Sequence, residues 1–478
     1  MSKERVIPAS EGPTLGPRPS LLRMLTWYMF CLCLPHVIIV ALLMIPLSEP
    51  SKTWQFDQLP YVITVALAVG IVNHYPISVV NIYLPDIAPV QCSLEPLGIA
   101  NAIVVAGLIC GISYGVEAFP IVFMTYIVWA PFWVFHSVVT ASRIQPRLLT
   151  FGHLSTYFPP SQRLACIAKL SMMPVFMSTA GISMMIIVVL FVSVSNTYHP
   201  SEWIAIGMEL GLLLLTHFVR ASIPWLQTHL FKFPLRSTSK FIHYQTELLI
   251  ASFLHLAFPH LDGILKLMVI LVTEVAQTVL SMLFLYKPYI DWLLHPESHK
   301  STLLTYFSLT FRVIGFNYIQ SPTPDSLNDD APPPTEWYWL EQAKHEFFLR
   351  LWASANSTLI FLSMYTIANY SYNAPFYPFH FGDEAYLLTT VSSVIISTSQ
   401  ITVALVLVPF TQRQYGTTRP PLELFESGYK YLSNPKEMAF LTHCSVSVSI
   451  VAFLLFVKQS NCFFTVLNGQ TLGKIYND

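Results

Sequence analysis

The chain alternates between long apolar runs and shorter polar segments. A helix needs about 20 mainly apolar residues to cross a bilayer. About eleven runs of this kind recur along the sequence, separated by polar or proline-containing segments. The predicted spans cover about 24–46, 61–83, 97–118, 120–141, 168–194, 202–219, 246–262, 264–286, 347–369, 386–410 and 438–457. The pattern therefore predicts an all-α, polytopic helical membrane protein.

The amino-acid composition agrees with this class. Hydrophobic residues make up 54% of the 478 positions and charged residues only 11%, whereas a soluble domain carries about 25% charged residues. The net charge of −1 offers no basic field for nucleic acid. The 7 cysteines form neither CxxC nor a metal-ligand spacing, so we expect no disulfide framework, metal or cofactor. The lipid bilayer is the predicted partner, and the sequence does not separate plasma membrane from endomembrane.

Lys and Arg residues set the predicted orientation. All but four of the 25 basic residues fall on one side of the predicted membrane or at a helix end that adjoins it. The positive-inside rule makes that side cytoplasmic, so the N-terminus is predicted inside and the C-terminus outside. We expect a cytoplasmic tail over 1–20, one helical bundle over 21–458 with a cytoplasmic loop at 287–346, and an extracytoplasmic tail over 459–478. The first apolar run is too long for a signal peptide, which predicts an uncleaved span.

The segment 302–319 challenges this count. It is nearly apolar enough to be a twelfth span, but it carries Arg312 at its middle. Counting it as a span would reverse the orientation of every later helix and would place the basic loop at 411–437 outside. We therefore predict an interfacial or re-entrant helix here.

Ionisable residues at mid-depth are the functional candidates. A charge at the bilayer centre costs roughly 2.5–3.5 kcal/mol on insertion scales, and such residues are usually functional. Glu209, His255 and Glu274 lie near the centres of three successive predicted spans. Gln277 follows Glu274 on the same helix face, while polar groups in the first two spans lie at a similar depth. The predicted substrate- or ion-binding residues are Glu209, His255, Glu274, Gln277, His74 and His36.

Two further patterns carry a prediction. His260 and Asp262 form a polar cluster at the outer edge of the predicted membrane. Gly107, Gly111 and Gly115 repeat every fourth residue, which places them on one helix face and allows close helix packing. Self-association of two copies through this face is a minority interpretation.

Three function classes stay open from the sequence. The first is a secondary transporter or permease in which buried Glu and His residues couple a proton or cation to an unidentified small solute. The second is a membrane-embedded enzyme acting on a lipid through His260 and Asp262, although no complete catalytic set is present. The third is a receptor or scaffold that transports nothing. Transport predicts polar groups that converge at mid-depth, lipid chemistry predicts them at the interface, and a scaffold predicts deep glutamates that do not meet.

Overall fold

The computed structural model describes residues 20–49, 51–75, 96–117, 122–148, 336–376, 383–412 and 420–455, together with separate residues between 163 and 279. Within these residues every regular element is helical, which confirms the predicted helical class. Five helical segments are long and apolar enough to cross a membrane. They are Leu21–Leu43, Phe56–Asn73, Gly98–Gly115, Phe347–Tyr370 and Tyr386–Pro409, and a shorter apolar helix covers Val128–Val139.

The helices follow the predicted spans closely where both can be compared. The first four are α1 (Leu21–Leu43), α2 (Leu59–Asn73, preceded by the 3-10 turn η1, Phe56–Gln58), α4 (Pro96–Val116) and α5 (Val122–Leu148). The last four are α13 (Glu336–Tyr370, followed by the 3-10 turn η9, Ala374–Phe376), α14 (Asp383–Gln412), α15 (Pro420–Leu432) and α16 (Pro435–Leu455). The four predicted spans between 168 and 286 contain only separate described residues, all helical, and 302–319 lies outside the described residues.

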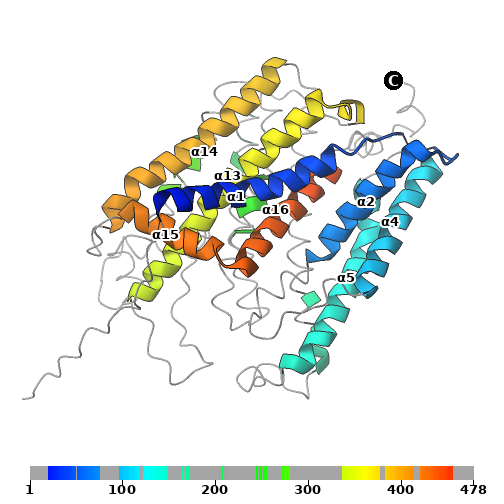
Figure 1. Ribbon diagram of the computed structural model, residues 1–478, viewed down its shortest axis with the longest axis horizontal. Coiled ribbons are helices and arrows are strands. Elements are labelled where there is room, and N and C mark those ends of the chain that lie inside the picture. Colours follow the sequence, from blue (N-terminus) through cyan, green and yellow to red (C-terminus); the bar gives the residue numbers. More distant parts are fainter. Residues whose placement is uncertain are drawn as a thin grey trace, which may run out of the picture.

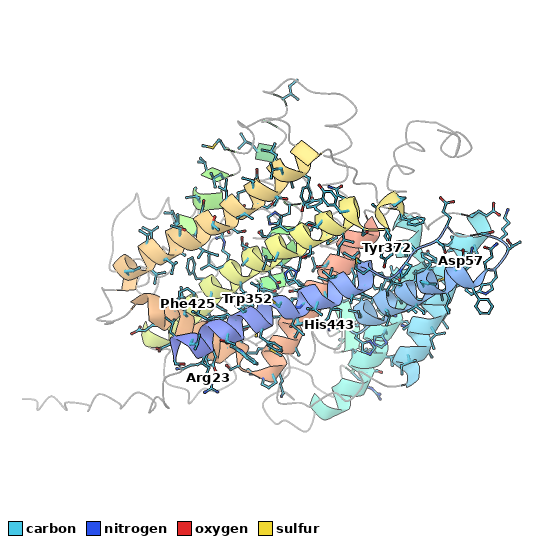
Figure 2. All side chains as sticks on the ribbon, turned by 45° about the horizontal axis from the view of Figure 1, so that its top comes forward. Arg23, Asp57, Trp352, Tyr372, Phe425 and His443 are labelled. Carbon is cyan, nitrogen blue, oxygen red and sulfur yellow. The ribbon has the colours of Figure 1, made fainter. Side chains whose placement is uncertain are left out.

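The described helices form two groups (Figure 1). Helices α1, α13, α14, α15 and α16 pack together, and α2, α4 and α5 form a second group beside them. Contact between α16 and α2 joins the two groups. His443 of α16 lies at this junction, where its Nε2 donates to the carbonyl oxygen of Ile71 at 2.6 Å (Figure 2).

Helices α1 and α13 run parallel. Tyr28 of α1 contacts Trp352 of α13, with ring centroids 5.8 Å apart. Further along both helices, His36 Nδ1 and Ser363 Oγ are hydrogen-bonded at 3.2 Å. The later residue of α1 thus contacts the later residue of α13. The two helices therefore run in the same direction, and both would cross a membrane in that direction.

Two predicted boundaries differ from the bounds of the described helices. The second span was expected to continue to about residue 83; α2 ends at Asn73, Tyr75 is again helical, and residues 76–83 lie outside the described residues. The predicted loop 287–346 also contains helix, because α13 begins at Glu336 and extends well beyond its apolar segment.

A helix that the sequence analysis did not predict, α15, occupies the polar segment between α14 and α16. Its buried residues, Leu424, Tyr431 and Leu432, recur with helical spacing. The Tyr28 hydroxyl donates to the Phe425 carbonyl, and Lys344 Nζ lies 3.8 Å from Glu423 Oε2. Burial raises the pKa of the Tyr431 phenol well above its ordinary value, with the charge of Glu437 adding to the rise.

Charged side chains are distributed unequally between the two ends of the bundle. Figure 2 shows Arg23 near Phe425 of α15, while Asp57 lies toward the opposite end. At that opposite end Lys52 pairs with Glu117 at 4.0 Å. The ion pair between Arg350 Nε and Glu247 Oε2, at 3.8 Å, belongs to the first part of α13. Four of the basic residues described with their side chains (Arg23, Lys344, Arg350 and Lys430) thus lie in or beside helix segments near α15.

Candidate functional site

His255 lies against both α13 and α14, and only 3% of it is exposed. Its Nε2 is hydrogen-bonded to Thr358 Oγ1 at 3.0 Å, and its Nδ1 to Ser393 Oγ at 3.3 Å. A neutral imidazole donates from one nitrogen and accepts at the other, and a hydroxyl can serve either role. The Tyr365 hydroxyl also donates to the His255 carbonyl oxygen at 2.7 Å. Two helices therefore fix both the ring and the backbone of this histidine.

Glu274 lies against α14 and is 8% exposed. Gln400 Nε2, from α14, donates to Glu274 Oε2 at 2.6 Å. The other end of the Gln400 amide accepts from Ser354 Oγ of α13 at 2.5 Å. Because the serine hydroxyl donates to the amide oxygen, the amide NH₂ is oriented toward the carboxyl group. Gln400 thus connects a carboxyl group from a distant segment to both helices.

These two sets of contacts belong to one continuous interface. On α13, Ser354 and Thr358 are four residues apart, and on α14, Ser397 and Gln400 are three apart, so each pair shares a helix face. Thr358 Oγ1 and Ser397 Oγ are hydrogen-bonded to each other. Pairing Ser354 with Gln400 and Thr358 with Ser397 makes α13 and α14 antiparallel. We call the residues of this interface the polar seam: Ser354, Thr358, Ser393, Ser397 and Gln400, with His255 and Glu274.

The hydroxyl and amide residues of the polar seam differ from its carboxyl group in the energetic cost of burial. Hydrogen bonds between Ser, Thr and Gln of neighbouring membrane helices contribute about 0.6 kcal/mol on average, so such residues often serve packing alone. A carboxyl group is a costly way to obtain one hydrogen bond, since its ionised form is strongly disfavoured in hydrocarbon. Glu274 is therefore the member of the seam whose presence packing explains least.

A second buried polar cluster has a structural character. Asn356 Nδ2 of α13 donates to the Tyr244 hydroxyl at 3.1 Å and to Ser445 Oγ of α16 at 2.7 Å. Tyr244 and Ser445 are hydrogen-bonded to each other at 2.8 Å. No residue of this cluster carries a charge at neutral pH. We interpret it as a set of structural hydrogen bonds that holds α13, α16 and the segment at Tyr244 together.

The predicted site residues fall in different places. Of the six, His255 and Glu274 share the polar seam, whereas His36 bonds Ser363 on another face of α13 and His74 lies at the end of α2. Glu209 and Gln277 lie outside the described residues, as do His260 and Asp262 of the outer-interface cluster.

The sequence analysis missed the hydroxyl residues of the polar seam. Thr358, Ser393 and Ser397 are uncharged, and single hydroxyls are common within spans. A usable signal was nevertheless present, because Ser354 and Thr358 are four residues apart and so are Ser393 and Ser397. That spacing places a polar row on one face of each helix.

The glycine face of α4 turns away from the other described helices. Gly107, Gly111 and Gly115 are exposed, and a Cβ built at any of them meets nothing within 4 Å. The opposite face of α4, including Val105 and Ile109, is buried. The expected close backbone approach at these glycines is therefore not made by any described part of the chain.

We expect Gln400→Leu to lower the stability of the folded protein. The substitution removes the bonds of Gln400 to Ser354 and Glu274, and a buried polar group that loses its partner costs about 1–3 kcal/mol. Thermal unfolding in detergent, followed by tryptophan fluorescence, would measure the change. The matched control is Thr398→Leu, because the Thr398 side chain on α14 is exposed and bonds only to its own helix. Equal melting temperatures for the two variants would contradict the assignment of Gln400 as the connecting residue.

Comparison of the chain with protein-family models, with curated proteins and with solved structures finds no match in any of the three. Function is therefore inferred from the helices that can span a membrane and from the polar groups between them.

Proposed function

We propose that this chain is a multi-pass membrane transporter or permease that couples a small solute to a proton or cation through Glu274 and His255. One observation carries the proposal. These two ionisable residues come from different predicted spans, yet both are buried in the polar seam between α13 and α14. Sites for substrate and coupling ions in secondary transporters lie between helices near mid-depth.

The surroundings of Glu274 suit a group that changes its proton or ion occupancy. Burial favours the neutral form of a carboxyl group, while donors such as the Gln400 amide favour the charged form. We therefore take Glu274 as the group that binds the proton or cation. Hydroxyl groups in the neighbouring turn, on Thr358 and Ser397, can reverse their donor and acceptor roles when the occupancy of His255 changes.

The parallel arrangement of α1 and α13 supports the eleven-span topology. If both helices cross the membrane in the same direction, the chain between them crosses an odd number of times. The predicted spans between 61 and 286 number seven, which satisfies this condition. Counting 302–319 as a further crossing would give an even number and an antiparallel α13. The proposed orientation, with the N-terminus in the cytoplasm, also suits the basic residues that gather near α15.

Glu274→Gln tests the proposal directly. The purified protein would be reconstituted into liposomes containing a pH-sensitive dye, and proton movement would be measured under an imposed membrane potential, with and without pools of small solutes. We expect solute-dependent proton movement in the wild type and none in Glu274→Gln. The matched control is Glu117→Gln, the same chemical change at a half-exposed residue that pairs with Lys52, and it should retain the wild-type rate.

Two results would overturn the proposed function. The first is a Glu274→Gln variant that moves protons as fast as the wild type. The second is wild-type protein that moves no more protons than empty liposomes with every solute pool. The second result would favour the receptor or scaffold interpretation, in which the polar seam only holds helices together.

A further inference from the structure

We propose that a second site, formed by α2, α4 and α5 beside α16, binds a small anion. Three histidines define it: His74 at the end of α2, His136 on α5 and His443 on α16. His74 interacts electrostatically with both His136 and His443, and His443 is bonded to α2 through the Ile71 carbonyl. This group, which we call the histidine cluster, is separate from the polar seam.

Buried donors without acceptors distinguish the histidine cluster from ordinary packing. His136 is 5% exposed, and within the described part of the chain neither of its ring nitrogens has a hydrogen-bond partner. The same holds for the indole N–H of Trp133, three residues earlier on the same face of α5. Nδ2 of Asn73 also has no hydrogen-bond partner in the described part of the chain. Asn73 precedes His74 and is completely buried. Leaving a buried donor unpaired costs about 1–3 kcal/mol, so several in one place call for a ligand.

The orientation of Asn73 is fixed by a neighbour. Trp129 Nε1 of α5 donates to Asn73 Oδ1 at 2.6 Å, which occupies the acceptor end of the amide. The end that remains is the NH₂ group, a donor. Trp129, Trp133 and His136 follow one face of α5 at positions i, i+4 and i+7, so this bond also brings Asn73 to the face that carries the other unpaired donors.

The chemistry of these donors selects an anion over a cation. Amide and indole N–H groups can donate but cannot bind a metal, and the described residues contain no group of three His, Cys, Asp or Glu able to hold one. On α4, Gly98 lets the imidazole lie close to the helix backbone, since a Cβ built there would lie 3.4 Å from His136 Cε1. The unpaired N–H donors of this site have no acceptor beside them within the described ranges. A halide or a small carboxylate would supply both the acceptor and a negative charge.

The described titratable groups near the histidine cluster come from α2 and α16. His74 Nδ1 donates to the Gly70 carbonyl at 2.8 Å, and the ring of Tyr75 packs edge-on against that of His443. Cys444, next to His443, interacts with Tyr75. Gly98 and Asn101, which α4 contributes, do not titrate. None of the groups named here is a carboxylate that would repel an anion.

Calorimetric titration of the purified protein in detergent tests this proposal without any transport assay. Sodium chloride and sodium acetate would be titrated separately at neutral pH. We expect saturable binding of at least one salt. Binding of chloride alone would identify an inorganic anion as the ligand, and binding of acetate would identify a carboxylate.

Two variants keep the proposal falsifiable. We expect Trp133→Phe, which removes the indole N–H and keeps an aromatic ring, to weaken binding about tenfold, the value of one hydrogen bond to a charged group. His136→Phe should abolish binding, whereas His345→Phe, a matched change on α13, should leave it unchanged. Absence of saturable binding by the wild type with both salts would overturn the proposal. Wild-type affinity in Trp133→Phe and His136→Phe would also overturn it. Failure of the Glu274→Gln flux test leaves this site unaffected, because binding is measured without flux.

Discussion

Asn373→Leu is expected to lower the melting temperature more than any other single change to a polar residue considered for this protein. Asn373 lies just after α13 and is completely buried. Its Oδ1 accepts from the Leu47 backbone N–H at 2.9 Å, and its Nδ2 donates to the carbonyls of Leu43 and Ile45, both at 2.8 Å. The last carbonyls of a helix have no partner within it. Asn373 therefore satisfies the end of α1 and joins it to the end of α13.

Leucine has a branched shape like that of asparagine but is larger, and it makes none of these three bonds. Each buried backbone group that loses its partner costs roughly 1–3 kcal/mol, so the variant should lose several kcal/mol. Asn373→Asp gives a second comparison, because a carboxylate keeps the acceptor for Leu47 but turns an oxygen toward the two carbonyls that Nδ2 bonds. Thermal unfolding in detergent should place both variants below the wild type. Equal stability of all three proteins would show that water or lipid headgroups replace the asparagine without cost.

The helical class and much of the helix order could be predicted from the sequence for a simple physical reason. Backbone groups in hydrocarbon must be satisfied within the segment, so a long apolar run can only be a helix or part of a barrel. The runs near 24–46, 97–118 and 386–410 correspond to α1, α4 and α14 within a few residues. Ends are less predictable, as α2 shows, because it ends at Asn73 inside a run whose apolar composition continues.

Amphipathic helices were harder to recognise. The segment that forms α15 has charged and polar residues in nearly every turn, so it does not stand out in a search for apolar runs. Its apolar face is formed by a few residues such as Leu424 and Leu432, and it is stabilised by the ends of α1 and α13. Tertiary contact, which no local pattern encodes, explains this helix.

The residues of the candidate site could also be predicted only in part. The depth of His255 and Glu274 in their runs marked them in advance, since a titratable group in hydrocarbon is costly. Their partners could not be assigned, because which face of α13 meets which face of α14 depends on packing between segments far apart in the chain. His136 and His443 were missed because a single histidine in a span carries little information until the helices that bring several together are known.

Gly428→Ala is the second change for which we expect a large loss of stability. Gly428 lies within α15, where alanine would ordinarily be preferred by about 1 kcal/mol. In this fold a Cβ at Gly428 would lie only 2.4 Å from Cε2 of Phe348 on α13. Phe348 is itself buried, stacked on Trp352 with ring centroids 5.9 Å apart and packed against Tyr28. The ring has little space to retreat, and overpacking of this kind costs about 1–3 kcal/mol.

The matched control is Gly70→Ala in α2, where an added Cβ meets nothing within 4 Å. That variant should be as stable as the wild type or slightly more stable, while Gly428→Ala melts at a lower temperature. A double variant separates a clash from a general effect on α15. Phe348→Leu removes the ring atoms that the new methyl group would meet, so the cost of Gly428→Ala should shrink in that background, as expected for residues in direct contact. An undiminished cost in the Phe348→Leu background would show that α15 needs Gly428 for its backbone and not for its contact with α13.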